Sequence, residues 1–422
     1  MPEKRNIVLI TLDSLRADHC SFMGYQRETT PTIDKMARDG LYFENAVAAG
    51  VPTRYSMFSI FTGDYLLISS DKEEDIRKEM IREFKTHKTL AQVLSEKGYK
   101  TAAFHANPWL SRLNGFDKGF IHFQDFISRD KASQLHTIIR KLPRIIVEKR
   151  VALTDWKKIY YAVLDWHRKV EEPYFLWVLL LDTHLPYMAP KKYRKFGNKS
   201  TLYLLYLNWK LRKAAFNPNI VISLRERERI INAYDDVICY ADEFVNKLWS
   251  NLKDDDPIFI IHSDHGEGFG EHGFYYHPHM LYEELIHVPL IIYNADVKGK
   301  IEKPVSLRGL PSTILDLIGE KNEFPSESLL KEDNDLVVSK IFYSGERKVA
   351  VRMKDWKFIM GQKKDDELYY LKEDPYEQNN LINRYPKLAE EMRKIARRHI
   401  KHDIEKTKIR NKVLIIGVRS NK

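Results

Sequence analysis

The chain has 422 residues, of which 43% are hydrophobic and 30% are charged, a balance that is ordinary for a soluble globular protein. Its formal net charge of +10 suits acidic partners such as phosphate or sulfate esters, an anionic membrane surface or nucleic acid, without choosing among them. The two cysteines exclude a disulfide framework and a CxxC metal site.

Targeting signals are weak in this sequence. No separate apolar segment precedes the apolar run at residues 7–10, and the longest such run, residues 175–181, is far too short to cross a bilayer. Free cysteines also favour a reducing compartment. We therefore expect a cytoplasmic protein that does not bind nucleic acid, and peripheral contact with an anionic membrane stays open.

Polar residues recur where apolar strands end. An apolar strand over residues 6–12 ends on Asp13, and a second one over residues 174–181 ends on Asp182, Thr183 and His184. Between them, Pro52 starts a predicted helix that carries Thr53 in its first turn, where free N–H groups favour a bound oxyanion. Thr53 could also be a plain helix cap.

A third strand end has the strongest pattern. The run Ile-Phe-Ile-Ile at residues 258–261 reads as a buried parallel strand, and the glycine-rich stretch SDHGEGFGEHG follows it at residues 263–273. Asp264 and His265 thus lie at the carboxyl edge of a sheet, where ligands bind in α/β folds. Such a pair suits Zn²⁺ or Mn²⁺, although a turn cap and a satisfied core histidine would explain it too.

The remaining segments complete the predicted architecture. Helices are expected at residues 30–40, 89–97 and 231–252, and a strand at 288–293. Residues 129–221 are rich in basic and aromatic residues and read as a helical insertion or lid. Beyond residue 335, alternating runs at 348–352, 357–360 and 367–371 predict antiparallel strands, followed by a helix over 386–400 and a basic tail. We predict an α/β fold with a mostly parallel central sheet flanked by helices and a small antiparallel sheet at the C-terminus.

These motifs together resemble the alkaline phosphatase superfamily, and specifically its sulfatase branch. The similarity lies in TLDSLRADH at residues 11–19, in residues 263–273, in LYEE at 281–284 with VPL at 288–290, and in the carboxyl-terminal signature around residues 357–381. The resemblance implies a sulfatase-like catalytic domain over residues 1–325 and a C-terminal α+β subdomain over 336–422.

The nucleophile position departs from the sulfatase pattern. Sulfatases carry Cys-x-Pro-x-Arg there and oxidise the first residue to formylglycine, whereas this chain has Thr53, Tyr55 and Met57 at those three positions. Threonine cannot yield formylglycine because of its methyl branch. The layout is instead similar to threonine-dependent members such as phosphoethanolamine transferases, in which the threonine forms a covalent phospho-intermediate.

The resemblance also implies roles for individual residues. The metal ligands would be Asp13, Thr53, Asp264 and His265. His184 and His277 would hold the substrate phosphate or a second metal, with His279 as a nearby alternative and Arg54 as added positive charge. With Ser14 in place of a second aspartate, the set favours Zn²⁺ or Mn²⁺, and Mg²⁺ and Ca²⁺ stay open.

Three functions follow from this sequence. The first is metal-dependent hydrolysis or transfer of a phosphate ester through Thr53. The second is hydrolysis of sulfate esters by the unmodified hydroxyl of Thr53 or Ser56. The third is a catalytically inactive protein that binds an anionic glycan or lipid. The five polar groups expected on one sheet edge argue against the third.

Overall fold

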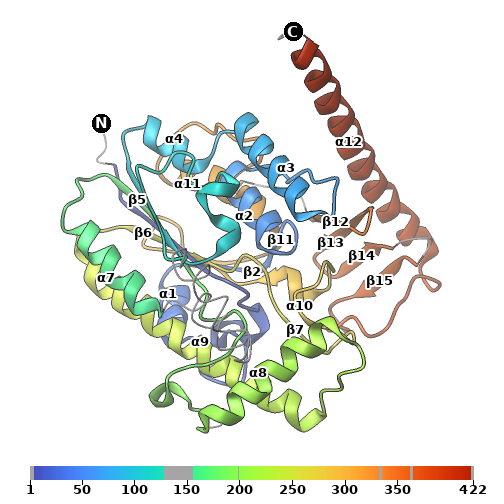
Figure 1. The fold of residues 1–422 in the computed structure, drawn as a ribbon, viewed down its shortest axis with the longest axis horizontal. Coiled ribbons are helices and arrows are strands. Elements are labelled where there is room, and N and C mark those ends of the chain that lie inside the picture. The colour runs from blue at the N-terminus through green and yellow to red at the C-terminus, as the bar shows by residue number, and fades with distance from the viewer. Residues whose placement is uncertain (1–3, 128–154, 198, 332–334, 362–364, 420–422) are drawn as a thin grey trace, which may run out of the picture.

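A computed structural model describes residues 4–127, 155–197, 199–331, 335–361 and 365–419. Its centre is a nine-stranded sheet in which most neighbouring strands are parallel (Figure 1). The order is β11 (Gly299–Ser306), β2 (Leu41–Val47), β10 (Leu290–Tyr293), β6 (Ile258–His262), β1 (Ile7–Leu12), β5 (Tyr174–Leu180), β3 (Lys100–His105) and β4 (His122–Asp125), and β9 (His287–Val288) pairs with β2. Only β10 runs antiparallel to both of its neighbours along this order. The predicted fold class is confirmed.

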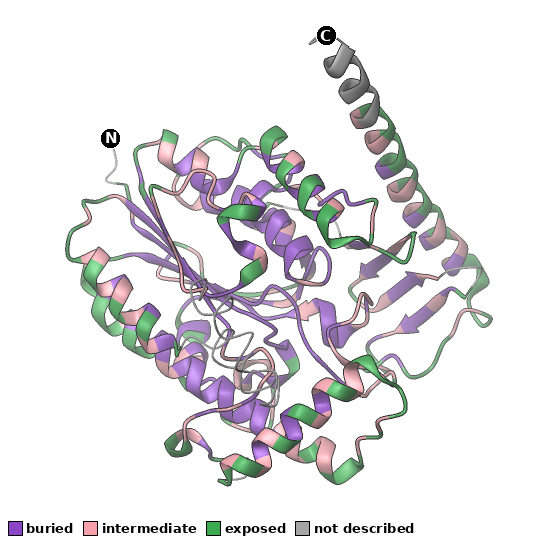
Figure 2. Ribbon diagram, viewed as in Figure 1, coloured by how far each residue is buried: buried purple, intermediate pink, exposed green. Residues whose placement is uncertain are grey.

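Both faces of the sheet are covered because its central strands are apolar on both sides. In β1, Ile7 and Leu9 point into one hydrophobic cluster, and Val8, Ile10 and Leu12 point into the other. The first cluster includes residues of α2 (Thr53–Thr62), α3 (Glu73–Thr86), α4 (Leu90–Glu96) and α11 (Leu310–Leu317). The second includes residues of α1 (Pro31–Asp39), α7 (Trp156–His167), α8 (Thr201–Phe216) and α9 (Leu224–Leu252) (Figure 2).

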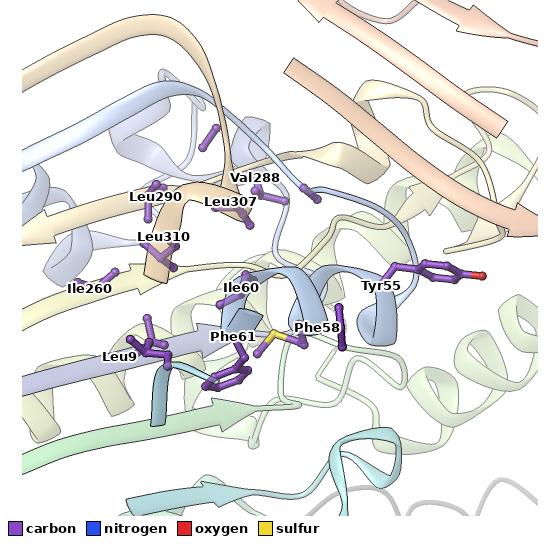
Figure 3. Close-up of a cluster of buried hydrophobic side chains, with 14 of the residues drawn as sticks. Leu9, Tyr55, Phe58, Ile60, Phe61, Ile260, Val288, Leu290, Leu307 and Leu310 are labelled. Atoms are coloured by element: carbon purple, nitrogen blue, oxygen red, sulfur yellow. The ribbon is translucent and has the colours of Figure 1, made fainter. Parts of the chain in front are cut away.

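Helix α2 is buried along its whole length, which fixes the position of its first residue, Thr53. Phe58, Ile60 and Phe61 lie in the same cluster as Leu9 of β1 and Ile260 of β6 (Figure 3). At its C-terminus, Gly63 adopts a left-handed φ of 68° and its N–H caps the Ser59 carbonyl. The helix is therefore held by packing rather than by surface contacts.

Two predicted boundaries in the central domain are wrong. Helix α9 was expected from residue 231 but begins at Leu224, because Ser223 and Glu226 form a capping box there. The strand expected over residues 288–293 is interrupted by Pro289, which has no N–H for a ladder hydrogen bond, and becomes β9 and β10. Within the predicted insertion over residues 129–221, residues 129–154 and 198 lie outside the described residues.

The C-terminal region forms the second, antiparallel sheet. Its strands are β12 (Leu336–Tyr343), β13 (Glu346–Met353), β14 (Trp356–Met360) and β15 (Glu367–Tyr370). Helix α12 (Pro386–Arg419) was expected to end near residue 400, but it continues through the predicted basic tail because residues 387–416 contain no glycine or proline. The predicted domain boundary between residues 325 and 336 stays a prediction. Ile341 and Ala350, which follow it, pack in the same hydrophobic cluster as α2, so the two sheets share part of one core.

A buried ion cluster joins this sheet to the central domain. Glu283, in the short helix α10 (Glu283–Ile286), lies 3.1 Å from both Arg352 of β13 and Lys357 of β14. Lys357 also lies 2.8 Å from Glu377. Since these side chains are almost fully buried, each charge depends on its partners.

Among the described residues, no helix combines the length and apolar character needed to span a bilayer.

Candidate active site

The polar strand ends meet at one edge of the central sheet. Strand β1 lies between β5 and β6 and runs parallel to both, so Asp13 comes level with the ends of its two neighbours. The Thr183 hydroxyl donates a hydrogen bond to the Asp13 carbonyl at 2.6 Å, which ties the end of β5 to the end of β1. The sheet therefore brings together groups that are far apart in the sequence.

Asp13, Asp264 and His265 form a compact set of metal-ligating groups. One ligand atom from each lies within 4.8 Å of the others, and all three side chains are buried. His265 Nε2 lies 3.5 Å from Asp264 Oδ2 and 3.9 Å from Asp13 Oδ1. Asp264 Oδ2 has no hydrogen-bond partner among the described residues. An orphaned carboxylate oxygen in such a set fits a bound divalent cation.

The charge balance of this set also fits a cation. Burial, together with the neighbouring Asp13 carboxylate, raises the pKa of Asp264 well above its usual range. Burial alone would lower the pKa of His265, but the Asp264 and Asp13 carboxylates outweigh it and raise that pKa. Two buried carboxylates with one imidazole thus carry excess negative charge, which a divalent ion would neutralise.

Thr53, the first residue of α2, lies next to this set. Its Oγ1 lies 3.1 Å from His265 Nε2, and its side chain is 4% exposed. His265 Nδ1 lies 2.8 Å from the Gly266 carbonyl and donates to it, so Nε2 carries the lone pair that faces Thr53. The hydroxyl also sits at the N-terminus of α2, where the helix dipole favours negative charge on a bound or developing oxyanion.

Two supporting residues were not predicted. Asn107, just beyond the end of β3, donates from Nδ2 to Asp13 Oδ2 at 2.8 Å, and its own Oδ1 accepts from the Trp109 N–H. The Ser14 N–H donates to Asp264 Oδ1 at 3.2 Å, with Ser14 in a left-handed conformation at φ 64°. Asn107 could have been found by the rule that found Asp13, because it also follows a buried strand of the parallel sheet.

His184 and His277 lie together beside the metal-ligating set. Their ring centroids are 5.0 Å apart, and the ring centroid of His277 is 4.5 Å from that of His265. His184 uses both nitrogens inside the protein, with Nδ1 2.8 Å from the Leu185 carbonyl and Nε2 3.0 Å from the Tyr276 hydroxyl. His277 Nδ1 lies 3.1 Å from the buried Glu267 carboxylate, and its Nε2 has no partner among the described residues. His277 is thus the better placed of the two to contact a substrate.

Arg54 and His279 form a second polar pair next to Thr53. Arg54 Nη2 donates to His279 Nε2 at 2.8 Å, and the guanidinium lies 5.0 Å from the Trp109 ring centroid and 5.2 Å from that of Tyr55. Arg54 is 7% exposed, and its buried Nε has no hydrogen-bond partner among the described residues. Burial lowers the pKa of Arg54, and burial with the Arg54 charge lowers that of His279 to about 4. A buried guanidinium with an unpartnered N–H beside a candidate nucleophile is suited to bind an anion.

Comparisons with known proteins agree with this geometry. The family described as Sulfatase matches residues 5–320. An arylsulfatase of Clostridium perfringens is 25% identical over 93% of this chain and 93% of its own length. The phosphoethanolamine transferase EptA of Helicobacter pylori is also 25% identical, but over 68% of this chain and 47% of its own length.

Among solved structures, the phosphonate monoester hydrolase of Agrobacterium radiobacter has the same fold. It superposes with a TM-score of 0.71 at 17% identity and covers 95% of this chain and 96% of its own. The family match extends over most of the chain and includes every strand end that contributes to the metal-ligating set. The protein is an enzyme of the alkaline phosphatase superfamily, and it belongs to the sulfatase family.

Proposed function

We propose that this enzyme hydrolyses or transfers phosphate esters, with Thr53 as its nucleophile. The observation that carries the proposal is the Thr53 hydroxyl 3.1 Å from His265, within a buried set of candidate metal ligands and at a helix N-terminus. A hydroxyl needs such surroundings because it is a poor nucleophile at neutral pH. A formylglycine mechanism is not available to a threonine.

Four residues of the site would bind a metal ion, and a fifth would orient one of them. Asp13, Thr53, Asp264 and His265 would hold one divalent cation, for which the imidazole favours Zn²⁺ or Mn²⁺. When bound, the cation would lower the pKa of the Thr53 hydroxyl and neutralise charge on the transferring group. Asn107 would keep the Asp13 carboxylate in its orientation through the 2.8 Å hydrogen bond.

The substrate-facing groups complete the proposed reaction. Thr53 Oγ1 would form a bond to phosphorus as the ester oxygen leaves, and water or an acceptor hydroxyl would then break the phosphothreonine bond. Glu267 holds Nδ1 of His277, which leaves Nε2 to hydrogen-bond the transferring group or the leaving oxygen. Arg54 would bind one of the anionic oxygens, since its buried Nε lacks a hydrogen-bond partner among the described residues.

The test compares esters and nucleophile variants. Purified protein with Zn²⁺ or Mn²⁺ would be assayed on aryl phosphate monoesters, diesters and aryl sulfates. We expect phosphate ester turnover, loss of at least about 10⁴-fold in Thr53→Ala, and a phosphoryl group on the Thr53 peptide after acid quenching. Thr62→Ala, at the other end of α2, is the matched control and should keep its activity.

Two outcomes would overturn parts of this proposal. Full activity of Thr53→Ala would show that Thr53 is not the nucleophile. Turnover of aryl sulfates alone would favour the sulfate ester hydrolase, which the arylsulfatase relatives make the second candidate. Absence of any turnover together with absence of metal binding would favour an inactive anion-binding protein.

A further inference from the structure

Helix α8 carries an exposed apolar stripe that no described part of the chain covers. Leu202, Tyr206, Trp209 and Phe216 are 79%, 44%, 43% and 75% exposed. Together with the exposed Lys213, they recur at spacings of four, three, four and three residues, which places all five on one face of the helix. The opposite face, with Leu204, Leu207 and Leu211, is buried in the core.

The apolar surface is concentrated in this part of the molecule. Val221 and Leu224, which follow α8, are 75% and 84% exposed. Six of the fifteen large hydrophobic residues found exposed among the described residues therefore fall within residues 202–224. Such clustering marks an interaction surface, whereas single exposed apolar residues are normal. We call these six residues the α8 patch.

Contacts with α9 hold the α8 patch in place. Glu226, in the first turn of α9, accepts a hydrogen bond from the Tyr206 hydroxyl at 3.3 Å and pairs with Lys210 at 2.7 Å. The same carboxylate completes the capping box with Ser223, which sets the position of Leu224. The patch thus spans α8, the start of α9 and the connection between them; Figure 1 shows where these two helices lie in the fold.

The charge of α8 distinguishes between possible partners. The helix contains Lys210, Arg212 and Lys213 and no acidic residue, within a chain of net charge +10. A symmetric pair of these helices would bring like charges together, which disfavours a second copy of the chain as the partner. Tyr, Trp, Phe and Leu next to Lys and Arg instead match the boundary between lipid headgroups and acyl chains.

The α8 patch reaches the rim of the candidate active site. Helix α8 packs against β8 (Tyr275–Tyr276), and the ring centroid of Phe216 lies 6.2 Å from that of Tyr276. The Tyr276 hydroxyl in turn contacts His184 Nε2 at 3.0 Å. A surface bound to α8 would therefore lie close to Tyr276, the residue that contacts His184 in the candidate active site.

We infer that the α8 patch docks the enzyme on the surface of an anionic lipid bilayer. Apolar side chains would enter the headgroup region, and Lys213 would contact lipid phosphates. The proposed association is peripheral, since it uses the exposed side chains of one helix face and of the segment that follows. The inference concerns the surface and does not require the proposed chemistry of Thr53.

Vesicle sedimentation tests this inference without catalysis. We expect the full-length protein to sediment with vesicles of phosphatidylcholine and phosphatidylglycerol, and much less with phosphatidylcholine alone or at high salt. The double variant Leu202→Gln and Trp209→Gln should partition at least about tenfold more weakly, since it removes two apolar anchors while keeping helix formers. Lys213→Glu should also weaken binding to the anionic vesicles.

The control is Tyr161→Gln, which removes an equally exposed aromatic residue from α7, 63% exposed, and should bind as the wild type does. Turnover of a small soluble aryl ester should be unchanged in the Leu202 and Trp209 double variant, which separates docking from chemistry. Equal binding by this variant and the wild type would overturn the inference. So would a lack of vesicle binding combined with a concentration-dependent dimer that the double variant abolishes.

Discussion

Arg54 gives the sharpest test of the site, because a structural role and a substrate-binding role predict opposite results. Its guanidinium is buried, lies over the rings of Trp109 and Tyr55, and has an Nε without a hydrogen-bond partner among the described residues. Replacing it with methionine keeps much of the volume and removes the charge. We expect Arg54→Met to lose activity while the fold keeps its stability.

The magnitudes follow from the contacts. One or two charge-assisted hydrogen bonds to a substrate oxyanion contribute about 2–4 kcal/mol, so kcat/KM should fall about 30- to 1000-fold. For the fold, losing two cation–π contacts and the hydrogen bond to His279 costs about 2 kcal/mol. Removing an unpaired buried charge returns a similar amount. The free energy of unfolding should therefore change by less than about 1 kcal/mol.

The assay pairs steady-state kinetics on the best ester with urea unfolding of the same preparations. Arg54→Lys should recover only part of the activity, since an ammonium lacks the planar fork of donors. Arg308→Met is the matched control, because Arg308 packs on Tyr65 and bonds the Gly63 carbonyl at the far end of α2. If Arg54→Met kept kcat/KM within about threefold, or lost stability in step with activity, the substrate-binding role would be refuted.

Three further predictions concern stability. Chelation of bound metal should lower the thermal midpoint of unfolding. Zn²⁺ or Mn²⁺ at 100 times its Kd should restore about 3 kcal/mol of the free energy of unfolding, because the cation relieves the repulsion between Asp13 and Asp264. An unchanged melting curve would argue against a metal site. Lys357→Met should cost about 3–5 kcal/mol in urea unfolding, because it leaves the buried Glu377 carboxylate without its ion-pair partner. Lys354→Met removes a surface ion pair and should cost much less; equal losses would contradict this reasoning. Gly119→Ala should lower the free energy of unfolding by more than about 3 kcal/mol, because the new Cβ would lie 2.1 Å from the Gln92 backbone nitrogen. Gly98 has a similar positive φ but open space around it, so Gly98→Ala should cost only about 1 kcal/mol in the same assay.

The sequence predicted the strand ends well because burial on both faces leaves a strong signal. The apolar strands that end before Asp13 and Asp264 have few alternative readings, and their parallel pairing brings those two residues together. Thr53 was placed by Pro52 at a helix start, which the structure confirms. In these cases a local pattern and a general rule of sheet topology were sufficient.

The residues that support the site gave a weaker signal or none. Asn107 follows a strand as Asp13 does, but an amide after a strand is also a common turn residue, and only the pairing of β3 with β5 brings it near Asp13. Glu267 is one of several acidic residues in a glycine-rich loop, and nothing local indicates that its carboxylate will be buried against His277. A residue such as Glu267 could therefore not be assigned without the tertiary structure, because the partner that fixes its side chain belongs to another part of the loop, brought close only by folding.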